Sequence, residues 1–191
     1  MSATLVIIDM QKAMDDPRYG TRGQHCAEDA ISRLLAHWRE TGQPVVHIQD
    51  SSTDPDSPYA PDKPTHDFKP QVKPLEHEPV VEKRSANAFV GTDLMQVLEE
   101  YQNAELVMCG VHLHGCVEST VRMAADLGFM VFLPSDCVIA VDKTAIDGTH
   151  YTADEVHALT LGILDGMAAK VITSEALMGT EQTRPDGVTL Q

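Results

Sequence analysis

Short apolar runs alternate with amphipathic stretches along most of the chain, and this alternation limits the possible folds more than any other feature. Six runs have the length and composition of strands buried in a sheet: residues 4–8, 45–48, 80–83, 106–111, 129–133 and 169–172. Helical patterns cover residues 26–41, 92–101, 116–128, 152–164 and 174–178. Strands that alternate with helices form a mostly parallel sheet with helices on both faces. We therefore predict an α/β fold, a three-layer α/β/α sandwich around a mostly parallel six-stranded Rossmann-like sheet.

Length and composition indicate one domain. We expect it to span residues 1–179, followed by a C-terminal tail, 180–191, that has no apolar periodicity. No apolar run approaches the roughly 20 residues of a membrane span, and the first run lacks the basic segment of a signal peptide. We therefore expect a cytoplasmic protein. The net charge of -15 argues against nucleic acid and an anionic membrane surface as partners.

Motifs for common cofactors are missing from the sequence. There is no GxGxxG and no GxxxxGK[ST], which removes the usual dinucleotide and nucleotide-phosphate fingerprints. The four cysteines form no CxxC pair and no zinc pattern. We expect no cofactor.

Residues 49–79 form an unusually long connection that carries most of the chain's 11 prolines. A loop of this length in a compact domain is usually functional or disordered. Because prolines restrict the backbone, we favour an ordered covering segment, and a solvated excursion without a site role is an equally open alternative. Tyr59, His66 and Phe68 are its candidates for contact with a ligand or a partner subunit, and Tyr59 and Phe68 are predicted substrate contacts. Phe89, in the turn after the third predicted strand, is another.

Cys116 lies where the fourth predicted strand gives way to a helix. Free N–H groups and the positive end of the helix dipole at such a position push a thiol toward the nucleophilic thiolate and can hold an oxyanion. A buried structural cysteine is the competing interpretation, because free cysteine is among the most buried residue types.

Two charged residues end other predicted strands. Asp9 follows the first strand and Lys83 ends the third, and ligands of open α/β sheets bind at the carboxyl ends of strands. Taken alone, an aspartate at the position of Asp9 is more commonly a helix-capping or loop residue, and a lysine such as Lys83 is by default a surface residue. Together with Cys116 they form a chemically sensible set: an acid that takes the thiol proton, a cation that holds the charged groups, and a nucleophile.

The segments around these residues are LVIIDMQ, VVEKRSANAFVGTDL and MCGVHLHGCVESTVRMAADLGF, and they resemble the isochorismatase-like cysteine hydrolases, which include nicotinamidases and N-carbamoylsarcosine amidohydrolases. The resemblance implies a three-layer α/β/α fold with an Asp9–Lys83–Cys116 triad. It also implies a cis peptide between Val111 and His112, and an oxyanion hole formed by the backbone N–H groups of His112 and Cys116.

Two departures from the family pattern affect the site. The Asp-x-His metal pair of nicotinamidases is missing from HIQDSSTD, and His47, Asp50, Asp54 and His66 have no ligand spacing, so we expect no metal. HLHG precedes Cys116 where relatives often have Thr-Asp or Thr-Asn. His114 then either hydrogen-bonds a substrate or caps the helix.

Gln11 is a candidate substrate contact, although its position two residues past Asp9 also fits a bracing role.

The resemblance implies a cysteine-dependent hydrolase that cleaves a C–N bond of a small amide or ureido substrate through a thioester. Two alternatives remain on this fold: an isochorismatase-type vinyl-ether hydrolase and a non-catalytic protein that binds a small ligand. We expect a small-molecule amide as substrate and a homodimer or higher homo-oligomer.

Overall fold

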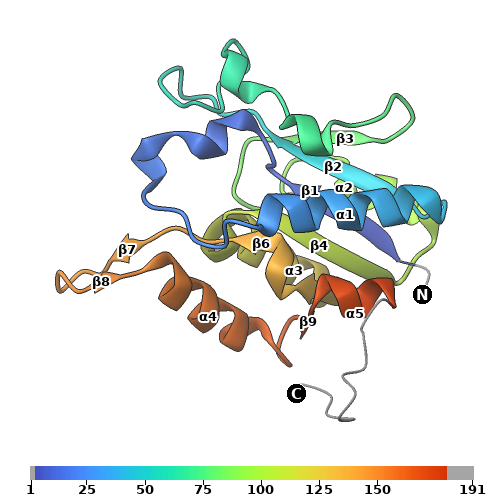
Figure 1. Ribbon diagram of the computed structural model, residues 1–191. Coiled ribbons are helices and arrows are strands. Elements are labelled where there is room, and N and C mark those ends of the chain that lie inside the picture. Colours follow the sequence, from blue (N-terminus) through green and yellow to red (C-terminus); the bar gives the residue numbers. More distant parts are fainter. Residues whose placement is uncertain (1–2, 180–191) are drawn as a thin grey trace.

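A computed structural model describes residues 3–179 and shows a parallel sheet as the centre of the fold (Figure 1). The strand order is β3-β2-β1-β4-β5-β9, with β6 beside β4, and every pairing in this sheet is parallel. The strands are β1 (Thr4–Ile8), β2 (Val45–Asp50), β3 (Val80–Lys83), β4 (Glu105–Val111), β5 (Met130–Pro134), β6 (Val138–Ile139) and β9 (Lys170–Ile172). The predicted fold class is confirmed, and all six predicted strands are in the sheet.

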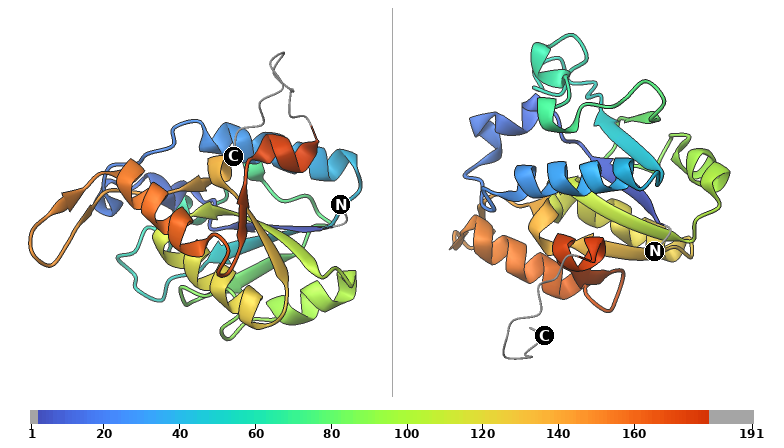
Figure 2. Two further views of the ribbon diagram at one scale, coloured as in Figure 1. Left: turned by 90° about the horizontal axis from the view of Figure 1, so that it is seen from below. Right: turned by 45° about the vertical axis from the view of Figure 1, so that its right-hand side comes forward.

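Helices cover both faces of the sheet, which gives the predicted three layers (Figure 2). On one face, α1 (Ala27–Glu40) and α5 (Ser174–Met178) pack on side chains such as Leu5 and Ile7. On the other face, α2 (Leu94–Tyr101), α3 (Glu118–Asp126) and α4 (Ala153–Leu164) pack on alternate strand residues such as Val6 and Ile8. Because side chains alternate across a strand, each fully apolar strand supplies both cores.

Two local predictions are wrong. Residues 135–149, to which the sequence pattern assigns a loop rather than a helix or strand, contain a 3-10 turn (Ser135–Cys137), the short strand β6 and β7 (Lys143–Thr144), which forms a hairpin with β8 (His150–Tyr151). Two-residue strands are too short to produce a periodic pattern. The helix expected from Cys116 begins instead with a π-helical turn, Leu113–Val117, and α3 starts at Glu118.

The proline-rich segment follows a defined path from β2 back to β3. It contains two 3-10 turns, Pro64–His66 and Pro70–Val72. Its anchor is the nearly buried Lys69, whose Nζ lies 2.8 Å from an oxygen of Asp15 and 3.0 Å from one of Glu28. Asp15 belongs to a further 3-10 turn, Lys12–Asp15, which is followed by another at Pro17–Tyr19. The segment is therefore tied to the residues that follow β1.

Within residues 3–179, no helix has the length and apolarity that crossing a membrane requires. The predicted C-terminal tail, 180–191, lies outside the described residues, so the domain boundary at residue 179 stays a prediction.

Gly110 allows β4 to pass close to β1 just before the site. It pairs with Ile8 and has a φ of 124°, and a Cβ built there would collide with the Ile8 backbone carbonyl. We predict that Gly110→Ala lowers the free energy of unfolding by about 3 kcal/mol or more, because backbone in a central strand cannot move aside. Urea denaturation measures this change.

Gly162→Ala is the matched control for this substitution. A Cβ at Gly162, in α4, meets no atom within 4 Å, so alanine there should raise the unfolding free energy by roughly 0.5–1 kcal/mol. Equal stability of the two variants would contradict the steric account of Gly110.

Candidate active site

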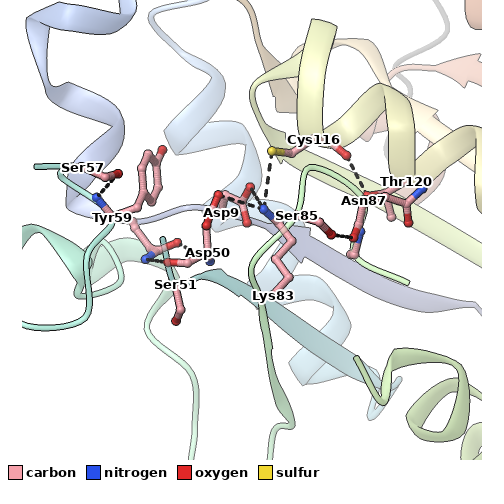
Figure 3. Close-up of polar contacts among 12 residues, drawn as sticks. Asp9, Asp50, Ser51, Ser57, Tyr59, Lys83, Ser85, Asn87, Cys116 and Thr120 are labelled. Atoms are coloured by element: carbon pink, nitrogen blue, oxygen red, sulfur yellow. Dashed lines mark hydrogen bonds and ion pairs between the residues drawn. The ribbon is translucent and has the colours of Figure 1, made fainter. Parts of the chain in front are cut away.

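The Lys83 side chain lies at the centre of a polar cluster at the carboxyl edge of the sheet (Figure 3). Its Nζ is 2.8 Å from Asp9 Oδ2, 3.0 Å from Asp50 Oδ2 and 3.5 Å from Cys116 Sγ. These residues come from the ends of β3, β1 and β2 and from the turn after β4. Parallel strands bring their carboxyl ends to one edge, which is why residues so distant in sequence meet here.

Lys83 is positively charged in this environment. Its side chain is buried, and burial alone would lower its pKa. The neighbouring Asp9, Cys116 and Asp50 side chains, together with the hydrogen bond to Asp9, outweigh that effect, so the net pKa of Lys83 is raised. The site therefore contains a permanent ammonium ion at neutral pH.

Asp9 has the properties of a proton acceptor. It is 2% exposed, and burial raises its pKa to about 6 although Lys83 opposes the shift. Oδ2 bonds Lys83, whereas the buried Oδ1 has no hydrogen-bond partner among residues 3–179. A carboxyl group whose pKa lies near neutrality, and one of whose oxygens has no hydrogen-bond partner, can take a proton and return it.

Cys116 does not have the lowered pKa expected from its place in the sequence. Burial, and then the negative charge of Asp9, raise the pKa of its thiol to about 12, while Lys83 opposes them. The thiol lies in the π-helical turn rather than in the first turn of an α-helix, so the dipole argument does not apply to it as expected. The resting site holds a thiol, and a base must remove its proton before it can attack.

The Cys116 backbone is tied to the loop after Lys83 (Figure 3). The buried Thr120 hydroxyl donates to the Cys116 carbonyl at 2.7 Å and accepts from the Ala88 N–H at 3.1 Å. The Asn87 amide donates to the Ser119 carbonyl at 2.9 Å. These bonds fix the position of the thiol relative to the ammonium.

Sequence reasoning did not identify Asp50 as a site residue. It ends β2, so the rule that selected Asp9 and Lys83 would have found it if the strand had been extended to its true end. One ligand atom each from Asp9, Asp50 and Cys116 lie within 4.8 Å of one another, the spacing of a metal site. All three contact the Lys83 ammonium, so a cation already lies among them.

The other residues considered for a metal site lie apart from this group. The fully buried His47 contacts Glu78 through Nε2 at 2.9 Å, and His66 Nε2 lies 3.0 Å from the Ser51 hydroxyl.

The peptide between Val111 and His112 is cis, as the resemblance implies. The His112 carbonyl accepts from the N–H groups of Gly115 and Val117 at 3.0 and 3.3 Å, which closes the turn around Cys116. The oxyanion role of the His112 and Cys116 N–H groups stays a prediction.

Four aromatic rings contact one another in a row: Tyr59, Tyr19, His112 and His114. Two of these residues, Tyr59 and His114, are predicted substrate contacts. The Tyr59 ring lies 5.8 Å from that of Tyr19, Tyr19 lies 5.2 Å from His112, and His112 lies 6.0 Å from His114. Tyr59 is nearly buried, and burial, followed by the negative charge of Asp9, raises the pKa of its hydroxyl. Burial lowers the pKa of His112 to about 4 and also lowers that of His114, so both imidazoles are neutral. Tyr19 was missed because it stands in a polar turn with no pattern.

The other three predicted substrate contacts, Gln11, Phe68 and Phe89, are not part of this row of rings. Gln11 is fully buried, and its amide donates to the carbonyls of Asp50 and His66, so no atom of it is exposed to a substrate. Phe68 packs against His47, with 5.7 Å between ring centroids, and lines a groove together with Lys12 and Pro74. Phe89 packs, half-buried, on the core beneath α2 and α3.

Fold and site together define a three-layer α/β/α protein with a cysteine, a lysine and two aspartates at one edge of a parallel sheet. Residues 3–176 match the model of the Isochorismatase domain. The isochorismatase family protein YrdC of Bacillus subtilis is 34% identical over 174 residues, which cover 91% of this chain and 93% of YrdC. The chain belongs to the isochorismatase family of hydrolases.

Solved structures support the same assignment. A crystal structure of an isochorismatase-family protein from Chromobacterium violaceum superposes with a TM-score of 0.90 at 43% identity, covering 94% of this chain and 93% of that one. Streptothricin hydrolase of Streptomyces noursei is 33% identical over 141 residues, 74% of this chain but 51% of that enzyme. The family includes amidohydrolases that act on C–N bonds, such as N-carbamoylsarcosine amidase and streptothricin hydrolase.

The raised pKa of Asp9 predicts how the reactivity of Cys116 depends on pH. Asp9 accepts the thiol proton only as a carboxylate, and that form is lost as the pH falls through about 6. The rate of Cys116 alkylation by iodoacetamide should therefore fall about tenfold per pH unit below that value. Peptide mass spectrometry follows Cys116 separately from the exposed Cys26. A rate that stays constant down to pH 4.5 would show that Asp9 is not the base.

Proposed function

We propose that this protein is a cysteine-dependent amidohydrolase that cleaves a C–N bond of a small amide or ureido substrate through a thioester. The observation that carries the proposal is the Lys83 ammonium in contact with both Asp9 and Cys116, next to an unpaired Asp9 oxygen. This arrangement supplies a nucleophile, a base and a fixed positive charge within one cluster.

In the first half of the reaction, Asp9 accepts the Cys116 proton as sulfur attacks the substrate carbonyl. The raised pKa of the thiol makes this transfer necessary, and the Lys83 ammonium stabilises the sulfur as it becomes negative. A C–S bond forms and the carbonyl π pair moves to oxygen. The backbone N–H groups of His112 and Cys116 are proposed to hold that oxyanion, each worth about 3 kcal/mol in comparable sites.

The intermediate collapses when protonated Asp9 gives its proton to the departing nitrogen. The C–N bond breaks, ammonia or an amine leaves, and a thioester to Cys116 remains. In the second half, Asp9 accepts a proton from water as the water oxygen attacks the thioester. Its proton then returns to sulfur, which releases the acid and restores the thiol. Asp9 thus alternates between base and acid, for which a pKa of about 6 is suited.

The substrate is a small molecule in this proposal because the reacting groups are recessed: Asp9 and Lys83 are buried, and Cys116 is half-buried. Membership in a family that includes amidases supports the reaction type.

The test is ammonia release from a panel of small amides and ureido acids. We predict that Cys116→Ala and Cys116→Ser lower release at least about 1,000-fold with unchanged circular dichroism, because the nucleophile is lost while the fold stays intact. Cys26→Ala is the matched control: Cys26 is exposed, and its loss should leave the rate unchanged.

Two results would contradict the proposal. One is a Cys116→Ala enzyme that still releases ammonia. The other is a wild-type enzyme that releases none from any amide and instead hydrolyses a vinyl ether.

A further inference from the structure

The partly exposed carboxylate of Asp50 is the part of the site that the mechanism above does not use. Its Oδ2 is 3.0 Å from Lys83 Nζ, and its side chain is 23% exposed, against 2% for Asp9 and 0% for Lys83. One carboxylate oxygen of Asp50 and the Cys116 sulfur lie within 4.8 Å of each other, so this carboxylate is an acceptor within the same cluster as the nucleophile.

Two hydrogen bonds with the Gln11 side chain fix the backbone position of Asp50. The buried Gln11 side chain accepts from the Asp50 N–H at 2.8 Å and donates to the Asp50 carbonyl at 3.0 Å. The backbone of this residue is therefore held on both sides by one amide. A carboxylate on such a rigid base is preorganised to select among substrates.

The charged groups around Cys116 include more negative than positive charges. One positive charge, on Lys83, faces two carboxylates, Asp9 and Asp50. The surrounding rings add no positive charge, because His112 and His114 are neutral. A further cation that acts on the two histidines is Lys143, which is exposed on β7, where solvent and salt screen its charge. The site thus carries a surplus of negative charge before any substrate enters.

We propose that Asp50 determines specificity by accepting a hydrogen bond from an N–H or ammonium group beside the scissile carbonyl. The enzyme then prefers neutral or cationic amides and disfavours substrates with a carboxylate next to that carbonyl. As a statement about substrate preference, this inference rests on the proposed function. Its electrostatic part concerns Cys116 alone and can be measured without turnover.

The test compares three alkylating agents of similar size at Cys116: iodoacetamide (neutral), iodoacetate (anionic) and 2-bromoethylamine (cationic). In each case sulfur forms a bond to carbon, the halide leaves, and the thiol proton passes to base. Rates are divided by those of the uncharged thiol 2-mercaptoethanol, which removes intrinsic reactivity.

We predict that Cys116 disfavours iodoacetate at least about tenfold relative to iodoacetamide after this correction, and does not disfavour 2-bromoethylamine. Asp50→Asn should remove most of that discrimination. Asp62→Asn is the matched control on the same segment, since Asp62 is exposed and should leave all three rates unchanged.

A carboxylate that acted only by positioning Lys83 would change all three rates by one factor in Asp50→Asn, and the ratios would stay constant. Constant ratios overturn the inference, and so does a wild-type site that reacts fastest with iodoacetate, a result that needs no variant.

A failure of the proposed function can be distinguished from a failure of this inference about Asp50. If no amide is hydrolysed while the alkylation ratios behave as predicted, Asp50 still selects for charge, and only the amidase proposal is lost.

Discussion

The buried ammonium of Lys83 is the interaction on which the rest of the site depends. A buried cation is costly unless it is paired and hydrogen-bonded, and here it contacts Asp9 and Asp50 at 2.8 and 3.0 Å. The three residues stand at the ends of three adjacent strands, β1, β2 and β3, so one charge ties together the edge of the sheet. The same ammonium then contacts Cys116 at 3.5 Å and links that edge to the turn after β4.

The state of the thiol explains why the site needs a separate base. Two carboxylates and burial outweigh the ammonium, so the pKa of Cys116 is raised to about 12 rather than lowered. A resting thiol is protected from unselective reaction but is a poor nucleophile. Asp9, with its pKa near 6 and an unpaired oxygen, is the group that can remove the proton when a substrate is present. The bonds from Thr120 and Asn87 hold the turn in place for that transfer.

Much of the fold could be predicted from the sequence because both faces of the central strands are buried and leave continuous apolar runs, as in β1. The position of Asp9 and Lys83 at one edge followed from parallel pairing. Asp50 was missed because polar residues obscure the end of β2, whose last four residues are His-Ile-Gln-Asp. The brace from Gln11 to Asp50 joins residues 39 positions apart, and no local pattern encodes such a contact.

A partitioning experiment tests the covalent intermediate at Cys116 most directly. Two amides that share one acyl group but release ammonia or methylamine are hydrolysed in the presence of hydroxylamine, and the ratio of hydroxamate to free acid is measured for each. A common thioester predicts the same ratio from both amides, because the leaving amine has departed before water or hydroxylamine attacks. Ratios that differ between the amides, or release of the acid without any hydroxamate, would contradict a thioester at Cys116.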